Sequence, residues 1–492
     1  MNVARAVLCW TLLGLVTAVG AEPEGSWLLT LRPAREAAVF DVAEEAQLKA
    51  IIRNVAGRDP ALALEFEVYD ADGQRRVGGT ASAAVPAGET RRIDLRLGTS
   101  AQLPAGEYLT VRVCLLVGGR CVAECRKGFG FLPRREAVGP PEQSPFGLLA
   151  EHHWPLLQRL GVRHVRPNWS WAERPMEWAN RYRIAYCPLM NEANAFVRGE
   201  LTERQYAEFV RESVRRYKGY VRCWQLGNEF DVFHREGPKA YVEAQRVGFT
   251  AAKAEDPQCV VIGGSITELQ VRREGFREAL DLGLAKFCDV YDFHFYADLK
   301  TTQDLLNYIH DTCRDCTAQK PIWVTETTQV GMFDPDDRNQ AEFVFKRYAH
   351  LLANGVSAVF WHALDWPYPF SADRTQATAL VDYEGFARPS LFAYAALTRD
   401  LGDVRFKRRW NAGQDVYALE FAGGPRTVLV LWSERPDAAA QIRHPAGDVL
   451  ITSPSGRQVR QSGAKGVTAV GLAGGPRLYQ LPGAVVELKY SP

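Results

Sequence analysis

The sequence has no excess of charge of either sign. Its 492 residues include 59 lysines and arginines and 58 aspartates and glutamates. Proteins that bind nucleic acids usually carry a basic patch or stripe, and a balanced composition gives no support for one. No acidic tail is present either. We therefore expect no nucleic-acid partner, and the 47% hydrophobic and 24% charged content is ordinary for a soluble globular protein.

Long apolar runs are also missing from the chain after its N-terminal segment. No stretch there reaches the roughly 18 apolar residues that indicate a membrane-spanning helix. The first 21 residues have a different pattern. Arg5 precedes an apolar segment over residues 6–19, and Val19-Gly20-Ala21 has the small side chains of a cleavage site. This pattern is typical of a secretory signal peptide. We expect residues 1–21 to be removed, the protein to be secreted or periplasmic, and no integral span, with an uncleaved anchor as the alternative.

Several catalytic motifs are absent. The sequence contains no Gly-x-Ser-x-Gly elbow and no His-Glu-x-x-His pair, which argues against a serine hydrolase and a zinc peptidase. His152, His153, Asp292 and His294 offer metal-ligand atoms, but their spacing matches no compact ligand set. We expect neither a metal nor any other cofactor.

The ten cysteines do not suggest a regular disulfide framework. Cys9 lies in the predicted signal peptide, and the nine that remain cannot all pair within one chain. Cys187 and Cys223 fall inside apolar runs, where we expect buried thiols. Two groups are close enough in sequence to bridge: Cys114, Cys121 and Cys125, which lie across one predicted hairpin, and Cys313 with Cys316, which we interpret as a disulfide or as structural thiols.

Strand-like patterns occur at both ends of the chain. Apolar and polar residues alternate in stretches such as 64–69 and 108–113, and turn signals such as Asp72-Gly73 separate them. Several short strands with no helical stretch are typical of an antiparallel β-sandwich. We expect one β-sandwich over residues 22–135, a proline-rich linker over 136–145 and a second β-sandwich over 402–492.

Between these regions, apolar runs alternate with helical patterns. Such alternation indicates an α/β protein with parallel strands, and a series of eight fits a (β/α)₈ TIM barrel over residues 146–401. The eight predicted strands cover residues 146–150, 162–167, 184–190, 221–226, 260–264, 290–296, 322–325 and 358–361. The predicted helices cover residues 154–160, 203–217, 238–254, 275–284, 302–313, 339–353 and 389–398.

Two predicted strands end on glutamates. The apolar run of residues 221–226 is followed by Gly227, Asn228 and Glu229, and the run that begins at residue 321 ends on Glu326. An Asn-Glu turn that starts the next helix would explain the first pattern alone. Two strands that each end in glutamate match the pair of carboxyl groups that glycoside hydrolysis requires. Active sites of such barrels lie at the carboxyl ends of the strands.

These residues resemble the clan A retaining glycoside hydrolases over residues 146–401. The resemblance rests on Trp-Gln-Leu-Gly-Asn-Glu at 224–229 and Trp-Val-Thr-Glu at 323–326. Supporting marks are Arg166, His-Phe-Tyr at 294–296 and Trp361. The resemblance implies that Glu229 is the acid/base and that Glu326 is the nucleophile.

The other candidate site residues have physical roles in such a reaction. Arg166 beside Glu326 would hold that carboxyl ionised, and Tyr296 could donate a hydrogen bond to it. Arg166 could instead be a structural ion-pair partner. The remaining candidates would bind substrate: Asn228 at a sugar hydroxyl, Trp361 as an apolar floor under the reacting ring, Trp169 and Trp171 along the groove, and His294. Core packing is the alternative for His294, Tyr296 and Trp361.

The sequence thus predicts a secreted retaining glycoside hydrolase that cleaves β-glycosidic bonds of an oligo- or polysaccharide. The alternative is a catalytically inactive barrel that binds glycan. A barrel of that kind would need the aromatic groove but would have no use for both carboxyl groups together with Arg166 and Tyr296. Sugar configuration, linkage, endo or exo action and oligomeric state do not follow from the sequence.

Overall fold

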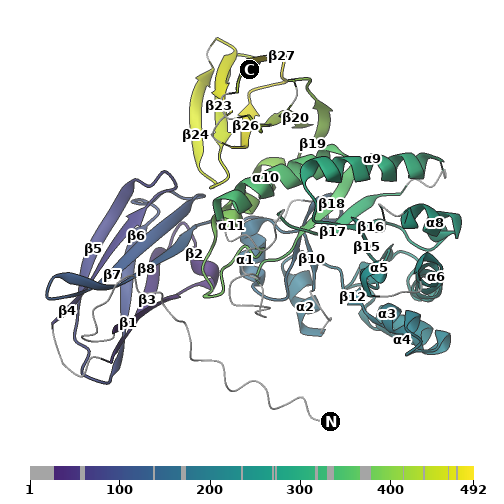
Figure 1. Ribbon diagram of the computed structural model, residues 1–492, viewed down its shortest axis with the longest axis horizontal. Helices are drawn as coiled ribbons and strands as arrows, with labels where there is room; N and C mark the ends of the chain where they lie inside the picture. The colour runs from purple at the N-terminus through teal and green to yellow at the C-terminus, as the bar shows by residue number, and fades with distance from the viewer. Residues whose placement is uncertain are drawn as a thin grey trace. The chain divides into compact units, whose positions relative to one another are not determined.

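A computed structural model describes residues 27–55, 61–136, 139–167, 173–233, 237–268, 271, 274–315, 320–329, 337–365, 378–413, 415–435, 438–463, 465–472 and 475–491. The chain divides into two compact units (Figure 1). One unit is Met1–Leu132 with Glu384–Ala387, and the other is Pro133–Tyr383 with Arg388–Pro492. The predicted signal peptide, Trp169, Trp171 and Cys316 lie outside the described residues.

The first unit contains two sheets that contribute to one hydrophobic core, and their strands are antiparallel except for the parallel pairing of β2 with β8. Buried and exposed side chains alternate along its strands because successive residues of a strand point to opposite faces. Leu48 and Phe66 come from different sheets, and Phe386 joins the same core. One sheet has the order β1 (Trp27–Pro33), β3 (Glu45–Asn54), β6 (Thr90–Thr99), and the other β2 (Val39–Phe40), β8 (Arg120–Phe131), β7 (Tyr108–Val117), β4 (Leu62–Tyr69), β5 (Arg75–Ala83). The short 3₁₀ helix η1 (Glu36–Ala38) precedes β2.

The cysteines of this unit correct one prediction. Cys114, Cys121 and Cys125 are free thiols, so the predicted hairpin bridge does not form. The register gives the reason for one pair: Cys114 lies opposite Glu124 and Cys125 lies opposite Val113, so Cys114 and Cys125 are on opposite faces of the sheet and cannot bridge. In the second unit Cys187 and Cys223 are buried thiols, as predicted.

The second unit contains the predicted parallel strands. A seven-stranded parallel sheet has the order β11-β10-β9-β18-β17-β16-β15, and a second sheet has the order β12-β13-β14. β9 pairs with both β10 and β18, so the first and last predicted strands of the series are neighbours. A parallel bridge between Ile262 and Val290 links the two sheets. The strands are β9 (Phe146–Leu149), β10 (His164–Arg166), β11 (Ala185–Tyr186), β12 (Leu189–Met190), β13 (Cys223–Leu226), β14 (Val260–Ile262), β15 (Ile266–Thr267), β16 (Tyr291–Phe295), β17 (Ile322–Thr327) and β18 (Val356–Trp361).

Helices follow most of these strands. In α4 a reciprocal cap starts the helix, because Thr202 accepts from the backbone of Gln205 while Gln205 accepts from the backbone of Thr202. No helix in the described ranges is both long and apolar enough to cross a membrane. The helices are η2 (Pro141–Gln143), α1 (Trp154–Leu160), α2 (Glu173–Arg181), α3 (Glu192–Val197), α4 (Glu203–Tyr217), α5 (Phe230–Phe233), α6 (Gly237–Glu255), α8 (Gly275–Asp281), η3 (Leu284–Lys286), α9 (Leu299–Asp315), α10 (Asp337–Ala353) and α11 (Pro389–Leu401).

The last part of the second unit is again made of strands. One sheet has the order β19-β20-β21-β26-β23-β24, and another has the order β25-β22-β27. Asp400 of α11 is buried and accepts hydrogen bonds from Thr452 and Gln480, which joins this part to the preceding helix. The strands are β19 (Arg405–Arg409), β20 (Val416–Gly423), β21 (Arg426–Ser433), β22 (Ala439–Arg443), β23 (Gly447–Thr452), β24 (Gln458–Gly463), β25 (Val467–Gly471), β26 (Arg477–Leu481) and β27 (Glu487–Ser491).

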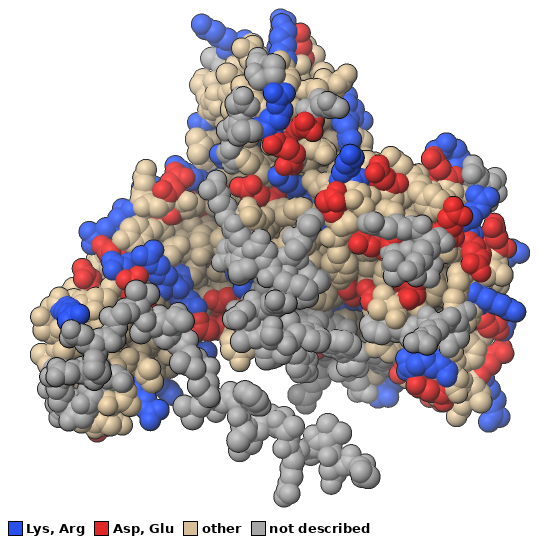
Figure 2. Space-filling model, in the orientation of Figure 1, with Lys and Arg blue, Asp and Glu red and all other residues tan. Residues whose placement is uncertain are grey.

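The charged side chains agree with the balanced composition. Basic and acidic residues are interspersed over the face that Figure 2 shows. Many of them pair across the surface, as Arg215 does with Glu255 at 2.7 Å and Arg112 with Glu124 at 2.8 Å. Exposed pairs of this kind contribute little to stability, typically about 0–1 kcal/mol each.

Candidate active site

Arg166 joins three strand ends. It is the last residue of β10 and is fully buried. Its guanidinium donates to Gln225 Oε1 at 2.7 Å, to Glu326 Oε1 at 2.6 Å and to Asn228 Oδ1 at 2.6 Å. A planar guanidinium holds several acceptors in fixed directions. The structure therefore brings Arg166, Asn228 and Glu326 together.

The second carboxylate oxygen of Glu326 accepts from Tyr296. The Tyr296 Oη to Glu326 Oε2 distance is 2.5 Å, and His294 Nδ1 lies 3.5 Å from the same oxygen. Burial would raise the pKa of Glu326, but the charges of His294 and Arg166 and the Tyr296 hydrogen bond outweigh burial and hold that pKa well below its usual range. Glu326 is thus kept ionised, which is the state that a nucleophile needs.

Glu229 lies directly after β13, in a turn with unusual backbone angles. Its φ is +42° and that of Gly227 is +84°. A glutamate in this left-handed region is strained, and such strain persists only where surrounding contacts fix it. The carboxylate binds His294, with 2.7 Å between Glu229 Oε1 and His294 Nδ1. A carboxylate oxygen of Glu229, a ring nitrogen of His294 and a carboxylate oxygen of Glu326 all lie within 4.8 Å of one another.

The hydrogen bonds of His294 show which of its ring nitrogens donates to Thr325 and which faces Glu229. Thr325 Oγ1 donates to Asp292 Oδ2 at 2.8 Å, so its oxygen accepts from His294 Nε2 at 3.1 Å. Nδ1 then faces Glu229. Burial would lower the pKa of His294, but the carboxylates of Glu326, Glu229 and Asp292 outweigh burial and raise it. His294 and Glu229 can therefore share a proton between them, and the fully buried ring lies against Glu229 rather than in open space.

Asp292 binds the residues that hold His294 and Arg166 in position. It was not among the predicted site residues. Its buried carboxylate accepts from Ser265 Oγ at 2.8 Å, from Gln225 Nε2 at 3.1 Å and from the Thr325 backbone at 3.2 Å. Burial is the main cause that raises the pKa of Asp292. The signal available in the sequence was an aspartate inside the apolar run of residues 290–296.

Asn194 of α3 fixes the turn that carries Glu229, and sequence reasoning missed it. Asn194 Nδ2 donates to the Asn228 carbonyl at 2.8 Å, and the Asn228 backbone N–H donates to Asn194 Oδ1 at 3.1 Å. A Cβ on Gly227 would come within 2.6 Å of Asn194 Oδ1, so this clamp needs glycine at position 227. No local sequence signal marks Asn194, since α3 itself was not predicted.

The aromatic candidates have different outcomes. Tyr296 contacts Glu326 directly, so it does more than fill the core. Trp361 ends β18, is fully buried, and its Nε1 donates to the Thr378 carbonyl at 2.8 Å. Its role as a floor under a sugar ring remains a prediction. Trp169 and Trp171 lie outside the described residues, so their role is also still a prediction.

Glu229, His294 and Glu326 could in principle hold a metal ion, because their donor atoms lie close together. Both oxygens of Glu326 already accept hydrogen bonds, one of them from the positively charged Arg166. A cation would have to displace those donors beside a fixed positive charge. The arrangement suits a carboxyl pair that exchanges protons better than it suits a metal.

Comparisons with known protein families and with curated proteins gave no match. Solved structures do share the fold. A family 39 glycoside hydrolase from Bacteroides cellulosilyticus WH2 is 16% identical, with a TM-score of 0.67 over 92% of this chain and 100% of that chain. A glucosidase from Croceicoccus marinus is 11% identical, with a TM-score of 0.52 over 70% and 97%. A GH30 endoxylanase from Clostridium papyrosolvens C71 is 13% identical, with a TM-score of 0.51 over 69% and 96%. The chain therefore shares the fold of clan A glycoside hydrolases, as the resemblance implied.

Proposed function

We propose that this protein is a secreted retaining glycoside hydrolase that cleaves β-glycosidic bonds, with Glu326 as nucleophile and Glu229 as acid/base. One observation carries the proposal: carboxylate oxygens of Glu229 and Glu326 lie within 4.8 Å of each other. Retaining enzymes hold their two carboxyl groups about 5–5.5 Å apart, whereas inverting enzymes need about 6.5–9.5 Å to admit a water. The spacing favours retention.

The reaction would proceed in two displacements. In the first, Glu326 attacks the anomeric carbon and forms a covalent glycosyl ester, while Glu229 gives its proton to the departing glycosidic oxygen. In the second, Glu229 takes a proton from water, the water oxygen attacks the anomeric carbon, and Glu326 leaves as a carboxylate. Each displacement inverts the configuration at the anomeric carbon, so after two displacements the product has the β configuration of the substrate.

The hydrogen bonds of the site support this division of roles. Glu326 is held ionised by Arg166 and Tyr296, while Glu229 faces a histidine with which it can share a proton. Asn228, whose Oδ1 accepts from Arg166, would bind a sugar hydroxyl next to the cleaved bond. Contacts of this kind strengthen in the transition state.

The proposal includes the fold and the location of the protein. We infer that the two parallel sheets form one (β/α)₈ barrel, which the pairing of β9 with β18 supports. The flanking sheets would be the predicted β-sandwiches, and residues 1–21 would direct secretion. A carbohydrate substrate agrees with the glycoside hydrolases that share the fold, two of which are described as a glucosidase and an endoxylanase.

The alternative is a barrel that binds glycan without cleaving it. The paired carboxyl groups argue against it, because a binding site has no need for one ionised nucleophile beside a second carboxyl group. Arg166 is fully buried at that pair, and burying such a charge is favourable only when good partners are present.

A substrate screen followed by one substitution tests the proposal. Aryl β-glycosides and β-linked polysaccharides are assayed first, and Glu326→Ala is then tested on every substrate that is cleaved. Turnover should fall to background, and azide should restore cleavage of the aryl glycoside with an α-glycosyl azide as product. Glu278→Ala, an exposed glutamate on α8, is the matched control and should stay active. Full activity of Glu326→Ala would overturn the assignment.

A further inference from the structure

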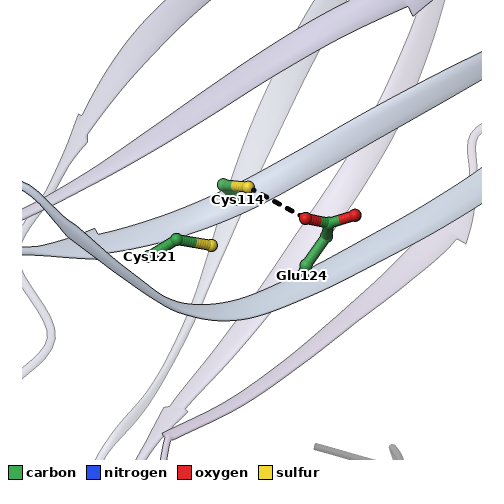
Figure 3. A group of neighbouring side chains, drawn as sticks. All are labelled: Cys114, Cys121 and Glu124. Carbon is green, nitrogen blue, oxygen red and sulfur yellow. Dashed lines mark hydrogen bonds between the residues drawn. The ribbon is translucent and has the colours of Figure 1, made fainter. Parts of the chain in front are cut away.

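The outer face of the β7–β8 hairpin carries two thiols and a carboxylate. Leu109, Val111, Val113 and Leu115 point into the core of the first unit, so Cys114 belongs to the opposite face. Cys114 lies opposite Glu124, and Cys121 lies opposite Leu116, two residues further along β7. Figure 3 shows the sulfurs of Cys114 and Cys121 and the carboxylate of Glu124 directed toward one another.

These three side chains are close enough to share one ligand. Their donor atoms all lie within 4.8 Å of one another, and the Cys114 thiol donates to Glu124 Oε2 at 3.5 Å. Zinc binds thiolate sulfur at about 2.3 Å in tetrahedral geometry, which separates two sulfurs by roughly 3.8 Å. Small side-chain rotations would therefore be enough to form the site.

We propose that Cys114, Cys121 and Glu124 bind a thiophilic divalent cation of the Zn²⁺ class. Two sulfur ligands and one carboxylate suit this class of ion and are poorly suited to Mg²⁺ or Ca²⁺. The group offers three protein ligands, so a water takes the fourth position. Cys121 is exposed, which leaves a path for the ion from solvent.

The surrounding charges suit such an ion. A divalent cation with two thiolates and a carboxylate leaves one net negative charge. Arg112 Nη2 binds Glu124 at 2.8 Å and Arg126 Nε binds it at 2.9 Å. Glu124 Oε2 also accepts the proton of the Cys114 thiol, and the ion would take the place of that proton, so neither arginine has to be displaced. Hydrogen bonds of this kind orient ligands and tune a metal site.

Cys114 makes metal binding depend on pH. Thiolate is the form that binds a metal, so the thiol ligands must lose their protons when the ion binds. Each proton released on binding weakens the apparent affinity by about tenfold per pH unit as the pH falls. Affinity should therefore decrease from neutral to mildly acid pH.

A disulfide between the same cysteines is the competing interpretation, and the register argues against it. Cys114 pairs with Glu124 and Cys121 pairs with Leu116, across the irregularity between Leu115 and Leu116, so the two cysteines are not opposite each other. Both are free thiols in the structure. Cys125 is excluded from the site, because it packs on the core side and its thiol donates to the Leu29 carbonyl at 3.3 Å.

The test uses the full chain, reduced with a phosphine and stripped with a chelator. Titration with Co²⁺ should give a thiolate charge-transfer band in the near ultraviolet that saturates at one equivalent, and Zn²⁺ should displace it. This band reports thiolate ligands only, so binding at Glu229, His294 and Glu326 cannot produce it. The same titration at lower pH should show weaker affinity.

Two cysteine variants complete the test. Cys121→Ala should weaken Zn²⁺ binding by more than about 100-fold, since even changes outside the ligand shell cost about 10–100-fold. Because Cys121 is exposed, this variant should fold normally. Cys125→Ser on the same strand is the matched control and should keep the band. No thiolate band in the reduced protein, an unchanged band in Cys121→Ala, or a Cys114–Cys121 disulfide in the isolated protein would each overturn the proposal.

Discussion

Arg166→Met should move the acid limb of the pH–activity profile upward. Arg166 Nη1 lies 2.6 Å from Glu326 Oε1, with side-chain exposures of 1% and 12%. Methionine keeps most of the length and volume of the side chain but removes the charge. Glu326 must be ionised to attack, so a higher pKa at Glu326 means that activity is lost at a higher pH when the solution is acidified.

The size of the shift can be worked from the geometry. Two unit charges about 4 Å apart interact by about 4 kcal/mol at an effective dielectric constant of about 20. One pKa unit corresponds to about 1.36 kcal/mol, so this interaction is equivalent to about 3 units at most. An arginine beside a carboxylate typically lowers its pKa by about 1–3 units. We therefore expect the acid limb of kcat/KM to rise by about 1–3 pH units.

The assay is kcat/KM against pH with an aryl glycoside that the wild-type enzyme cleaves. Arg166→Lys is the control: it keeps the charge but loses the fork that also holds Gln225 and Asn228. Its acid limb should stay near that of the wild type while kcat falls. Circular dichroism checks that both variants fold. An unmoved acid limb in folded Arg166→Met would refute the electrostatic role and leave Arg166 as a structural ion-pair partner.

Three further substitutions test the remaining roles. Glu229→Ala should slow glycosides with poor leaving groups by about 10²–10⁴-fold and activated aryl glycosides much less, because only the former need the proton; equal losses on both would exclude Glu229 as the acid. Asn194→Ala should cost about 1–3 kcal/mol of stability, measured by denaturant unfolding, because it leaves Asn228 backbone groups unpaired, and it should lower kcat most for poor leaving groups. Unchanged kcat would reduce Asn194 to a purely structural residue. Tyr296→Phe removes a hydrogen bond to Glu326 but no charge. The acid limb of its pH–activity profile should therefore move upward, as in Arg166→Met, but by a smaller amount. A downward shift would contradict the role of Tyr296 in keeping Glu326 ionised.

The sequence pattern located the strands and helices that carry the site, because those elements have strong periodicity. The predicted helix 203–217 matches α4, and the predicted strand 358–361 falls within β18. Two predicted strands differ: residues 184–190 form the two short strands β11 and β12, and the strand predicted at 260–264 ends at Ile262, with the separate strand β15 after it. The short helices α2, α3 and α5 have too few turns to give a clear apolar period.

Site residues at strand ends were predictable because a charged residue after an apolar run stands out. The groups that hold them were not, because they pair across long stretches of sequence. Gln225 and Asp292 are 67 positions apart, and Asn194 and Asn228 are 34 apart. The pairing of β7 with β8, which decides what faces each cysteine, shifts by one residue between Leu115 and Leu116, and no turn signal in the sequence marks this shift. Contacts of this kind are decided by the packed fold rather than by local propensity.

The central claim is that Glu229 and Glu326 act together as a retaining pair. The most direct measurement is the proton NMR spectrum of the first sugar released from a cleaved β-glycoside, recorded before the anomers equilibrate. Carboxylate oxygens within 4.8 Å predict that the β anomer appears first and the α anomer grows later by mutarotation. Initial release of the α anomer would show inversion and would contradict the account.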